Sequence, residues 1–280
     1  MSAVNELALL DAILPLLPKN DQVITGPGDD CAVLKWNDAW DLLVTADQLI
    51  EAVHYTPETP PREAGAKLMK RNLSDIAAMG GEPLWAVVTL AAGATGAPGL
   101  KEFMAGAARE GARYGVAVCG GDISSLPGEG VVTTLTLAGR VPRGQAVLRS
   151  GAQPGDLLYV TGEIGNAFGS GHHLSFTPRL EEGKTLRNMA HAMLDVSDGL
   201  LLDARRLAVR SGVDLEIDAD AVPLRAGAQL PDALSDGEDY ELLFCAPPGA
   251  PGTVIGRVLP GKGEIRLPGV KQIGKYGYEH

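Results

Sequence analysis

The chain has 280 residues and a formal net charge of −11, with 45% hydrophobic and 5% aromatic residues. This length can bury a sizeable core and leaves room for two domains. The acidic balance and the lack of a basic stripe argue against a nucleic-acid-binding protein, and no apolar run approaches the roughly 20 residues that span a membrane. We therefore expect a globular protein with neither a nucleic-acid nor a membrane partner.

The first half alternates strand-like and helical patterns. Residues 1–18 carry leucines at helical spacing together with acidic residues and no basic leader, which predicts an amphipathic helix and not a signal peptide. Further along, the pattern predicts strands at 31–35, 41–46, 83–92, 116–119 and 131–141, and helices at 61–79 and 100–114.

Glycine and proline become dense between Arg149 and Asp156, so we place a boundary there between domains 1–148 and 149–280. The second half predicts strands at 157–162, 213–217, 240–244 and 253–259, and a helix at 199–210. Residues 169–187 have no clear period. His172 and His173 lie in this stretch without an HExxH pattern, so we expect loop residues and not zinc ligands. The whole order indicates an α/β or α+β fold, with sheets covered by helices.

The cysteines indicate a reducing compartment. Cys31, Cys119 and Cys245 are odd in number and far apart, which fits neither a disulfide framework nor a CxxC metal site. We expect reduced thiols and a cytoplasmic protein.

Most of the candidate aspartates lie at the ends of predicted strands, often beside glycine, and Asp75 lies on the predicted helix 61–79 with Asn72 one turn away. They lie in the stretches GPGDD (26–30), TADQ (45–48), NLSD (72–75), CGGDIS (119–124), LDVSDG (194–199) and SDGED (235–239). One such stretch is typical of an ordinary turn. Carboxylate pairs beside apolar runs are not needed in turns, whereas hard oxygen ligands suit Mg²⁺ that is shared with substrate phosphates. The joint pattern therefore favours a phosphate site with several metal ions.

Other phosphate motifs fit poorly. The stretch GVKQIGKY (269–276) matches GxxxxGK, but Tyr replaces Ser or Thr and too few residues follow to form the phosphate-binding helix. The HRD and DFG motifs of protein kinases are missing, and GEIGNAFG lacks the spacing of a dinucleotide fold.

Several blocks together resemble the thiamine-monophosphate kinase family. They are GPGDDCAVL, TADQLIEAVHY, KRNLSDIAAMGGEP, CGGDIS, VLRSGAQPGD, LDVSDGLLLD and SDGEDYELLF, in the order and approximate spacing of that family. The resemblance covers nearly the whole chain. It implies a two-domain PurM-like architecture, in which the N-terminal sheets of two subunits form a barrel in a homodimer. It also implies the transfer of a phosphoryl group from ATP to thiamine monophosphate, which gives thiamine diphosphate.

The resemblance also implies roles for individual residues. It implies several Mg²⁺ ions, with ligands at Asp30, Thr45, Asp47, Asp75, Asp122, Asp195 and Asp198. It implies ATP contacts at Tyr114, Gly121, Asp122, Arg149 and Ser197. It implies substrate contacts at His54, Glu238 and Tyr276. The acceptor phosphate is already mostly a dianion at neutral pH, so positioning and charge neutralisation would carry an in-line transfer without a catalytic general base.

Three features depart from the family pattern. Ala46 stands where a threonine is usual, Tyr276 is displaced by one position from the usual C-terminal aromatic residue, and the chain is shorter than most relatives. Two alternatives therefore stay open at this point: a non-catalytic nucleotide-binding module, and another ATP-dependent enzyme of the superfamily that includes aminoimidazole ribonucleotide synthetase.

Overall fold

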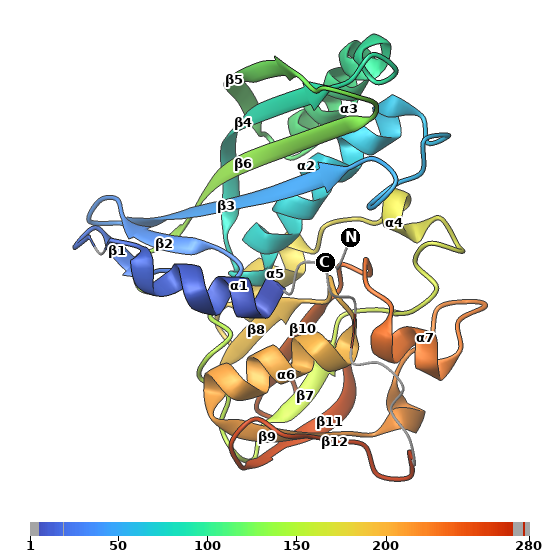
Figure 1. The fold of residues 1–280 in the computed structure, drawn as a ribbon. Coiled ribbons are helices and arrows are strands. Elements are labelled where there is room, and N and C mark those ends of the chain that lie inside the picture. Colours follow the sequence, from blue (N-terminus) through green and yellow to red (C-terminus); the bar gives the residue numbers. More distant parts are fainter. Residues whose placement is uncertain (1–5, 19, 271–276, 278–280) are drawn as a thin grey trace.

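The computed structural model describes residues 6–18, 20–270 and 277. Two six-stranded sheets form the body, one built from residues 23–142 and the other from residues 157–266 (Figure 1). This mixed α/β architecture confirms the expected fold class. The break between the sheets spans residues 143–156, and the boundary at 148/149 stays a prediction.

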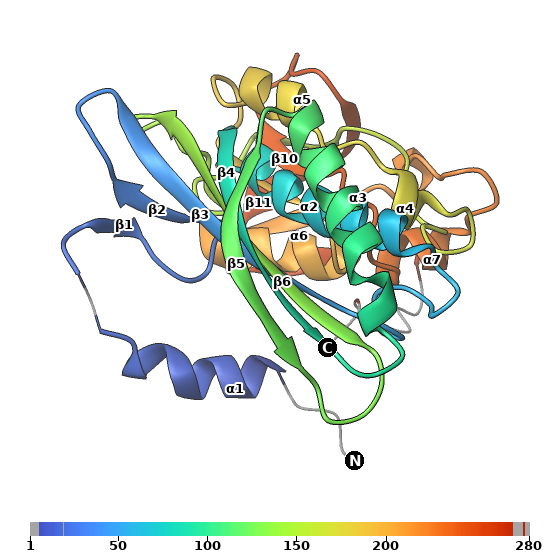
Figure 2. The ribbon, with the colours of Figure 1, turned by 90° about the horizontal axis from the view of Figure 1, so that it is seen from above.

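The first sheet is antiparallel except for one pair. Its strand order is β1 (Val23–Thr25), β2 (Ala32–Lys35), β3 (Trp40–Ile50), β6 (Val131–Pro142), β4 (Glu82–Ala92) and β5 (Ala117–Ser125). Strands β4 and β5 run parallel, because α3 (Leu100–Arg113) lies in the connection between them. Figure 2 shows α2 (Pro61–Ala78) and α3 on the same side of this sheet.

Two glycines let α2 and α3 pack backbone against backbone. A Cβ added to Gly65 would lie 1.9 Å from the carbonyl oxygen of Phe103, and one added to Gly106 would lie 1.9 Å from that of Arg62. Any side chain at either position would therefore push the helices apart. Helix α2 begins with proline at its first position, where the missing N–H costs nothing.

The second sheet packs against α2 as well. Its strand order is β12 (Ile265–Arg266), β9 (Val213–Ile217), β11 (Thr253–Pro260), β7 (Leu157–Val160), β10 (Leu242–Ala246) and β8 (Ala192–Asp195). Tyr159 and Phe244 belong to the core that contains α2 residues, whereas the alternate residues Leu158 and Leu243 pack in the core of α6 (Leu200–Ser211). Helix α2 therefore lies between the two sheets and contributes to the core on both sides.

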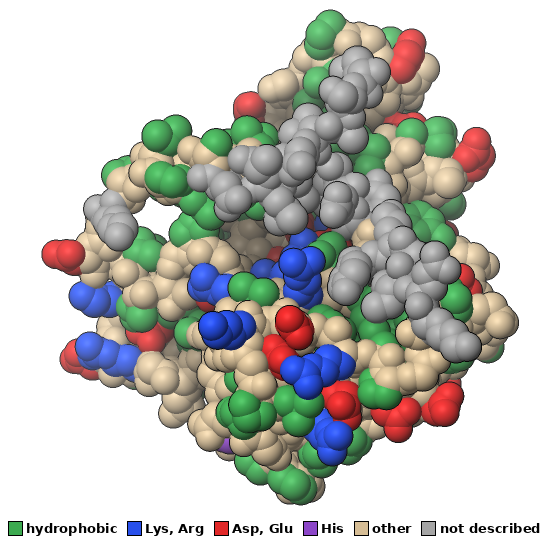
Figure 3. All heavy atoms as spheres, turned by 60° about the horizontal axis from the view of Figure 1, so that its bottom comes forward, with side chains coloured by type: hydrophobic (Ala, Val, Ile, Leu, Met, Phe, Trp, Pro, Cys, Tyr) green, Lys and Arg blue, Asp and Glu red, His purple; other side chains and the backbone are tan. Residues whose placement is uncertain are grey.

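Short elements complete the chain. They are α1 (Glu6–Ile13), the 3₁₀ turns η1 (Leu14–Leu16), η2 (Ala97–Gly99) and η3 (Ala219–Ala221), and the helices α4 (His172–Ser175), α5 (Leu180–Leu186) and α7 (Leu230–Ser235). On the face drawn in Figure 3, Lys and Arg side chains lie among Asp and Glu side chains. Within the described ranges, no helix has both the length and the apolar character needed to cross a membrane.

The structure corrects three local predictions. The strands expected to end at residues 46 and 119 continue to Ile50 and Ser125, so Asp47 and Asp122 lie within strands and not after them. The end of β5 was missed because its Gly-Gly-Asp-Ile-Ser sequence lacks an apolar pattern, and backbone pairing with β4 holds it at the sheet edge. His172 and His173 begin the one-turn helix α4 instead of lying in a loop.

Candidate functional site

Three aspartates from separate parts of the chain meet where α2 lies between the two sheets. Asp30 precedes β2, Asp75 lies in α2 and Asp195 ends β8, and one carboxylate oxygen from each lies within 4.8 Å of the other two. We call these three residues the aspartate cluster. Such closely spaced oxygen donors are the ligand type that Mg²⁺ prefers.

The aspartate cluster is electrostatically unfavourable without a cation. Burial, followed by the charges of neighbouring aspartates, raises the pKa of Asp75 and Asp195 well above the usual range. Burial also raises the pKa of Asp30, although the Arg149 guanidinium opposes this shift. The Oδ2 atom of Asp30 is buried and accepts no hydrogen bond from any described residue. A buried, unpaired carboxylate oxygen beside two further acids fits a metal ligand, and the donor set therefore suits Mg²⁺.

Neighbouring side chains fix how the cluster is oriented. Thr45 on β3 donates its hydroxyl hydrogen to Asp75, and Ser74 donates to Asp195, both at 2.5 Å between oxygens. The Nη2 atom of Arg149 lies 2.6 Å from Oδ1 of Asp30. The sequence-predicted residues Asp30, Thr45, Asp75, Arg149 and Asp195 are therefore together in the structure.

Asp47 lies beside this cluster on β3. Its charge is the largest of the neighbouring charges that raise the pKa of Asp75. Its backbone N–H donates to Asn72, and Nε of Arg71 donates to its carboxylate at 3.3 Å. Asp47 therefore lies between the aspartate cluster and Arg71 of α2.

The turn after β8 holds Ser197 and Asp198 beside a salt bridge. Arg206 Nη1 lies 2.5 Å from Asp198 Oδ2, and the backbone N–H groups of Ser197 and Asp198 both donate to the carboxylate of Asp203. Burial and the Asp198 charge raise the pKa of Asp203 to about 6. The sequence analysis missed the structural role of Asp203. Its position as an acidic residue in the first turn of the predicted helix is a signal that could have identified it.

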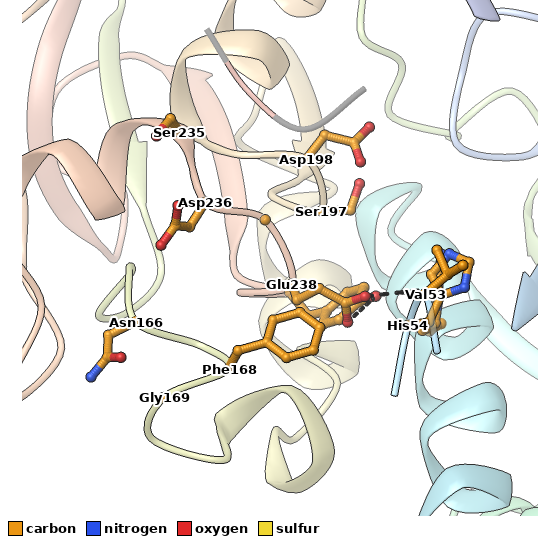
Figure 4. A pocket seen from close by; sticks show the side chains of 13 residues that line it. Val53, His54, Asn166, Phe168, Gly169, Ser197, Asp198, Ser235, Asp236 and Glu238 are labelled. Atoms are coloured by element: carbon orange, nitrogen blue, oxygen red, sulfur yellow. Dashed lines mark hydrogen bonds and ion pairs between the residues drawn. The ribbon is translucent and has the colours of Figure 1, made fainter. Parts of the chain in front are cut away.

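A pocket of about 410 Å³ opens next to this turn (Figure 4). Its lining includes Ser197 and Asp198 at one end, and His54, Phe168 and Glu238 further in. Figure 4 shows His54 on the opposite side of the pocket from Asn166, with Glu238 between them. The predicted substrate residues His54 and Glu238 thus share a cavity with two residues predicted for the phosphate site.

Glu238 is held in a strained backbone conformation by several contacts. Its φ angle is +74°, its N–H donates to the carbonyl of Ser197, and Tyr240 donates to its carboxylate at 3.0 Å. A Cβ on the preceding Gly237 would lie 2.3 Å from the carbonyl oxygen of Ser197. The glycine in the SDGED stretch is therefore needed for the close approach of the two turns.

Lys67 connects both predicted substrate residues. Its fully buried ammonium lies 2.6 Å from Glu238 Oε2, 2.6 Å from the carbonyl oxygen of His54 and 3.1 Å from Nδ1 of His173. Burial lowers the pKa of Lys67 to about 8, although the Glu238 charge opposes this shift. The ring of His54 accepts a hydrogen bond at Nδ1 from the Ile50 N–H. The sequence analysis missed Lys67 and His173, because their roles depend on a contact between distant segments.

Three further predicted ATP residues lie elsewhere. Pairing across β3, β6, β4 and β5 places Gly121 three strands from Asp47, which is about 14 Å at a strand spacing of about 4.8 Å. Asp122 is in register with Gln48, so it points to the other face of the sheet from Asp47. Tyr114 follows α3 near the start of β5. The predicted substrate residue Tyr276 lies outside the described residues.

Comparison with known proteins gives consistent matches over most of the chain. Residues 28–141 match the family model of the N-terminal domain of AIR synthase related proteins, and residues 177–255 match that of the C-terminal domain. The chain is 35% identical to the thiamine-monophosphate kinase of Salmonella typhimurium, over 80% of this chain and 77% of that protein. It is 36% identical to the thiamine-monophosphate kinase of Rhodopirellula baltica, over 85% of this chain and 84% of that protein.

Solved structures agree with these matches. The structure of AaThiL complexed with AMPPCP and TMP has a TM-score of 0.87 and 31% identity, and it covers 100% of this chain and 98% of its own. The thiamine-monophosphate kinase of Stenotrophomonas maltophilia has a TM-score of 0.75 and 32% identity, with 95% and 97% coverage. The hydrogenase maturation protein HypE, at 16% identity and a TM-score of 0.67 over 91% and 92% of the two chains, shares the fold.

Proposed function

The chain belongs to the thiamine-monophosphate kinase family of enzymes, and we propose that it transfers the γ-phosphoryl group of ATP to the phosphate of thiamine monophosphate. An oxygen of the acceptor phosphate forms a bond to the γ-phosphorus while the bond from that phosphorus to the β–γ bridging oxygen breaks, and ADP leaves with the electron pair. The observation that carries this proposal is the location of the aspartate cluster beside the pocket that contains His54 and Glu238.

We propose that Asp30, Asp75 and Asp195 hold Mg²⁺, with Thr45 and Asp47 beside them. The raised pKa values of Asp75 and Asp195 and the unpaired buried oxygen of Asp30 support a bound cation. When bound, the ions would neutralise the charge of the phosphates. Asp198 is paired with Arg206 and Asp122 lies on β5, so these two predicted ligands remain proposals that depend on further rearrangement or on a second subunit.

The side chains of the pocket would position the acceptor. Thiamine monophosphate carries a cationic ring and an anionic phosphate, so it needs both a negative and a positive surface. Glu238 provides a carboxylate that Lys67 and Tyr240 hold in place, and His54 lies across the pocket from it. Positioning two reactants in this way supplies much of the rate increase in phosphoryl transfer, and no side chain is needed as a strong base.

We propose that ATP contacts Arg149 and Ser197 of one subunit and the edge formed by Tyr114, Gly121 and Asp122 of a second subunit. In one chain, Arg149 and Ser197 lie beside the aspartate cluster. Gly121 and Asp122 lie on β5, which is three strands away from β3 in the sheet. A homodimer would bring the two groups together.

Exposed surfaces of the first sheet support this homodimer and its intersubunit barrel. Nearly every residue of the edge strand β5 is exposed, and Ile123 is 72% exposed. Trp85 is 43% exposed on the face of the sheet that points away from α2 and α3, and Leu16 of η1 is 78% exposed. An unpaired strand edge beside apolar surface is a site for pairing with another chain. We therefore propose that the protein is a homodimer. The free thiols of Cys31, Cys119 and Cys245 support a reducing compartment, and we propose that this compartment is the cytoplasm.

A product assay tests the proposed reaction. The protein is incubated with ATP, MgCl₂ and either thiamine monophosphate or free thiamine, and the products are separated by chromatography. We expect thiamine diphosphate and ADP from the monophosphate only. Binding of ATP without any product would support a non-catalytic nucleotide-binding module, and ATP turnover that ignores thiamine monophosphate would point to another reaction of the superfamily.

A further inference from the structure

Arg71 lies on α2 between the two halves of the site. Its Nε atom is 3.3 Å from Oδ2 of Asp47, and its Nη1 atom is 3.7 Å from Oε1 of Glu238. The residue lines the pocket, yet it is only 8% exposed. Nη1 is buried and makes no hydrogen bond to any residue in the described part of the chain. A buried charged donor without a partner is costly, so this atom requires an explanation.

Charge balance alone does not explain Arg71. Glu238 already has Lys67 at 2.6 Å and the Tyr240 hydroxyl at 3.0 Å, so the guanidinium at 3.7 Å adds no hydrogen bond to it. Removing Arg71 would leave Glu238 paired. The spare donor therefore points to a group that this structure does not contain.

The other cations of α2 near the pocket are occupied. The ammonium of Lys67 contacts Glu238, the carbonyl of His54 and the ring of His173, which uses its three hydrogens. Lys70 donates to the carbonyls of Leu174 and Phe176. Of these three cations, Arg71 is the one that lines the pocket, and its buried Nη1 has no hydrogen-bond partner in the described part of the chain.

We propose that Arg71 binds the phosphate of the acceptor molecule, and this inference rests on the proposed function. A guanidinium presents several donors in a planar fork that matches phosphate oxygens. Its position between Asp47, on the side of the aspartate cluster, and Glu238, on the side of the acceptor, is where an acceptor phosphate must lie to reach ATP. Arg71 would also reduce the repulsion between the two anionic reactants.

Binding measurements on variants test this role separately from catalysis. The variants are Arg71→Gln and Arg71→Lys, and Arg62→Gln is the matched control, because Arg62 lies on the same helix in an exposed salt bridge with Glu102. Calorimetry measures the affinity for thiamine monophosphate and for thiamine, which differ only in the phosphate. Losing a hydrogen bond between charged groups should weaken binding of the monophosphate by about 10-fold to 100-fold in Arg71→Gln. Binding of thiamine should change less than about threefold.

Each outcome decides the question. Retained preference for the monophosphate in Arg71→Gln, or an equal loss for both ligands, would overturn the proposal and leave a structural role. Arg71→Lys keeps the charge but not the fork, and we expect an intermediate loss of phosphate preference, with the thermal midpoint near that of the wild type. If Arg71→Gln does not fold, Arg71→Lys decides, and an unchanged preference there would refute the role. Failure of the proposed function would show instead as wild-type protein that yields no thiamine diphosphate.

Discussion

Replacing Asp195 by asparagine should stabilise the protein in the absence of divalent ions. The carboxylate oxygens of the aspartate cluster lie within 4.8 Å of one another, so each charged pair would repel by about 3 kcal/mol at an effective dielectric constant of about 20. Proton binding relieves part of this repulsion, because burial raises the pKa of Asp195 and its neighbours. Asparagine can still accept the hydrogen bond from Ser74. We therefore expect a gain of about 1–2 kcal/mol in the free energy of unfolding at pH 8.

Urea unfolding followed by circular dichroism, in EDTA and in 10 mM MgCl₂, measures this effect. In EDTA the wild type should lose stability as the pH rises from the ordinary aspartate pKa towards the raised pKa of the folded protein. In that pH range the folded protein binds more protons than the unfolded chain, so each increase in pH favours unfolding. In Asp195→Asn this decline should be shallower. Magnesium at 100 times its dissociation constant adds about 2.7 kcal/mol to the wild type, and the variant should lose most of that gain. A variant that is less stable than the wild type in EDTA, or that gains as much from magnesium, would refute the reasoning.

Three more predictions concern His54, Lys67 and His173. His54→Ala should raise KM for thiamine monophosphate, and steady-state kinetics that show an unchanged KM would count against its contact with the substrate. Lys67→Met should lower the free energy of unfolding by about 3–5 kcal/mol, because it removes the buried cation that lies 2.6 Å from the Glu238 carboxylate. Adding Glu238→Gln should recover part of the loss, and a simple sum of the two single effects would contradict the pairing. Burial and the Lys67 charge lower the pKa of His173 from 6.5 to about 4. The titration of His173 therefore lowers the free energy of unfolding as the pH falls from 6.5 towards 4. His173→Gln should remove this contribution from the difference in urea midpoint between pH 7 and pH 5.

The elements that the sequence predicts well have a strong apolar period or a turn signal. Helix α2 begins and ends within one residue of its predicted limits, because its apolar residues recur at helical spacing and a proline precedes it. Asp30, Asp75 and Asp195 could be singled out because they stand beside apolar runs, where a carboxylate needs a reason. These signals are local in the sequence, so they can be recognised without knowledge of the tertiary structure.

The remaining features depend on contacts between distant segments. The sequence KLMKRN, residues 67–72, looks like a basic surface of a helix. Lys67 is nevertheless fully buried and Arg71 nearly so, because α4 contacts Lys67 and the turn before β10 contacts both residues through Glu238. Helix α4 has no period of its own, and its place is set by His173 against Lys67. The position of Asp122 on the exposed edge strand β5 could not be predicted either, because the sequence of a single strand does not determine its place in the order of the sheet.

The placement of α2 between both sheets has a consequence for how the molecule comes apart. Tyr159 and Phe244 of the second sheet share a hydrophobic core with residues of α2. Removing either sheet from the chain would therefore expose the apolar residues of that core to water. A truncated product that ends before the second sheet, or a fragment that begins there, would expose that surface and aggregate. Denaturation of the intact chain should accordingly occur in one step, with the acceptor pocket and the acidic centre lost together.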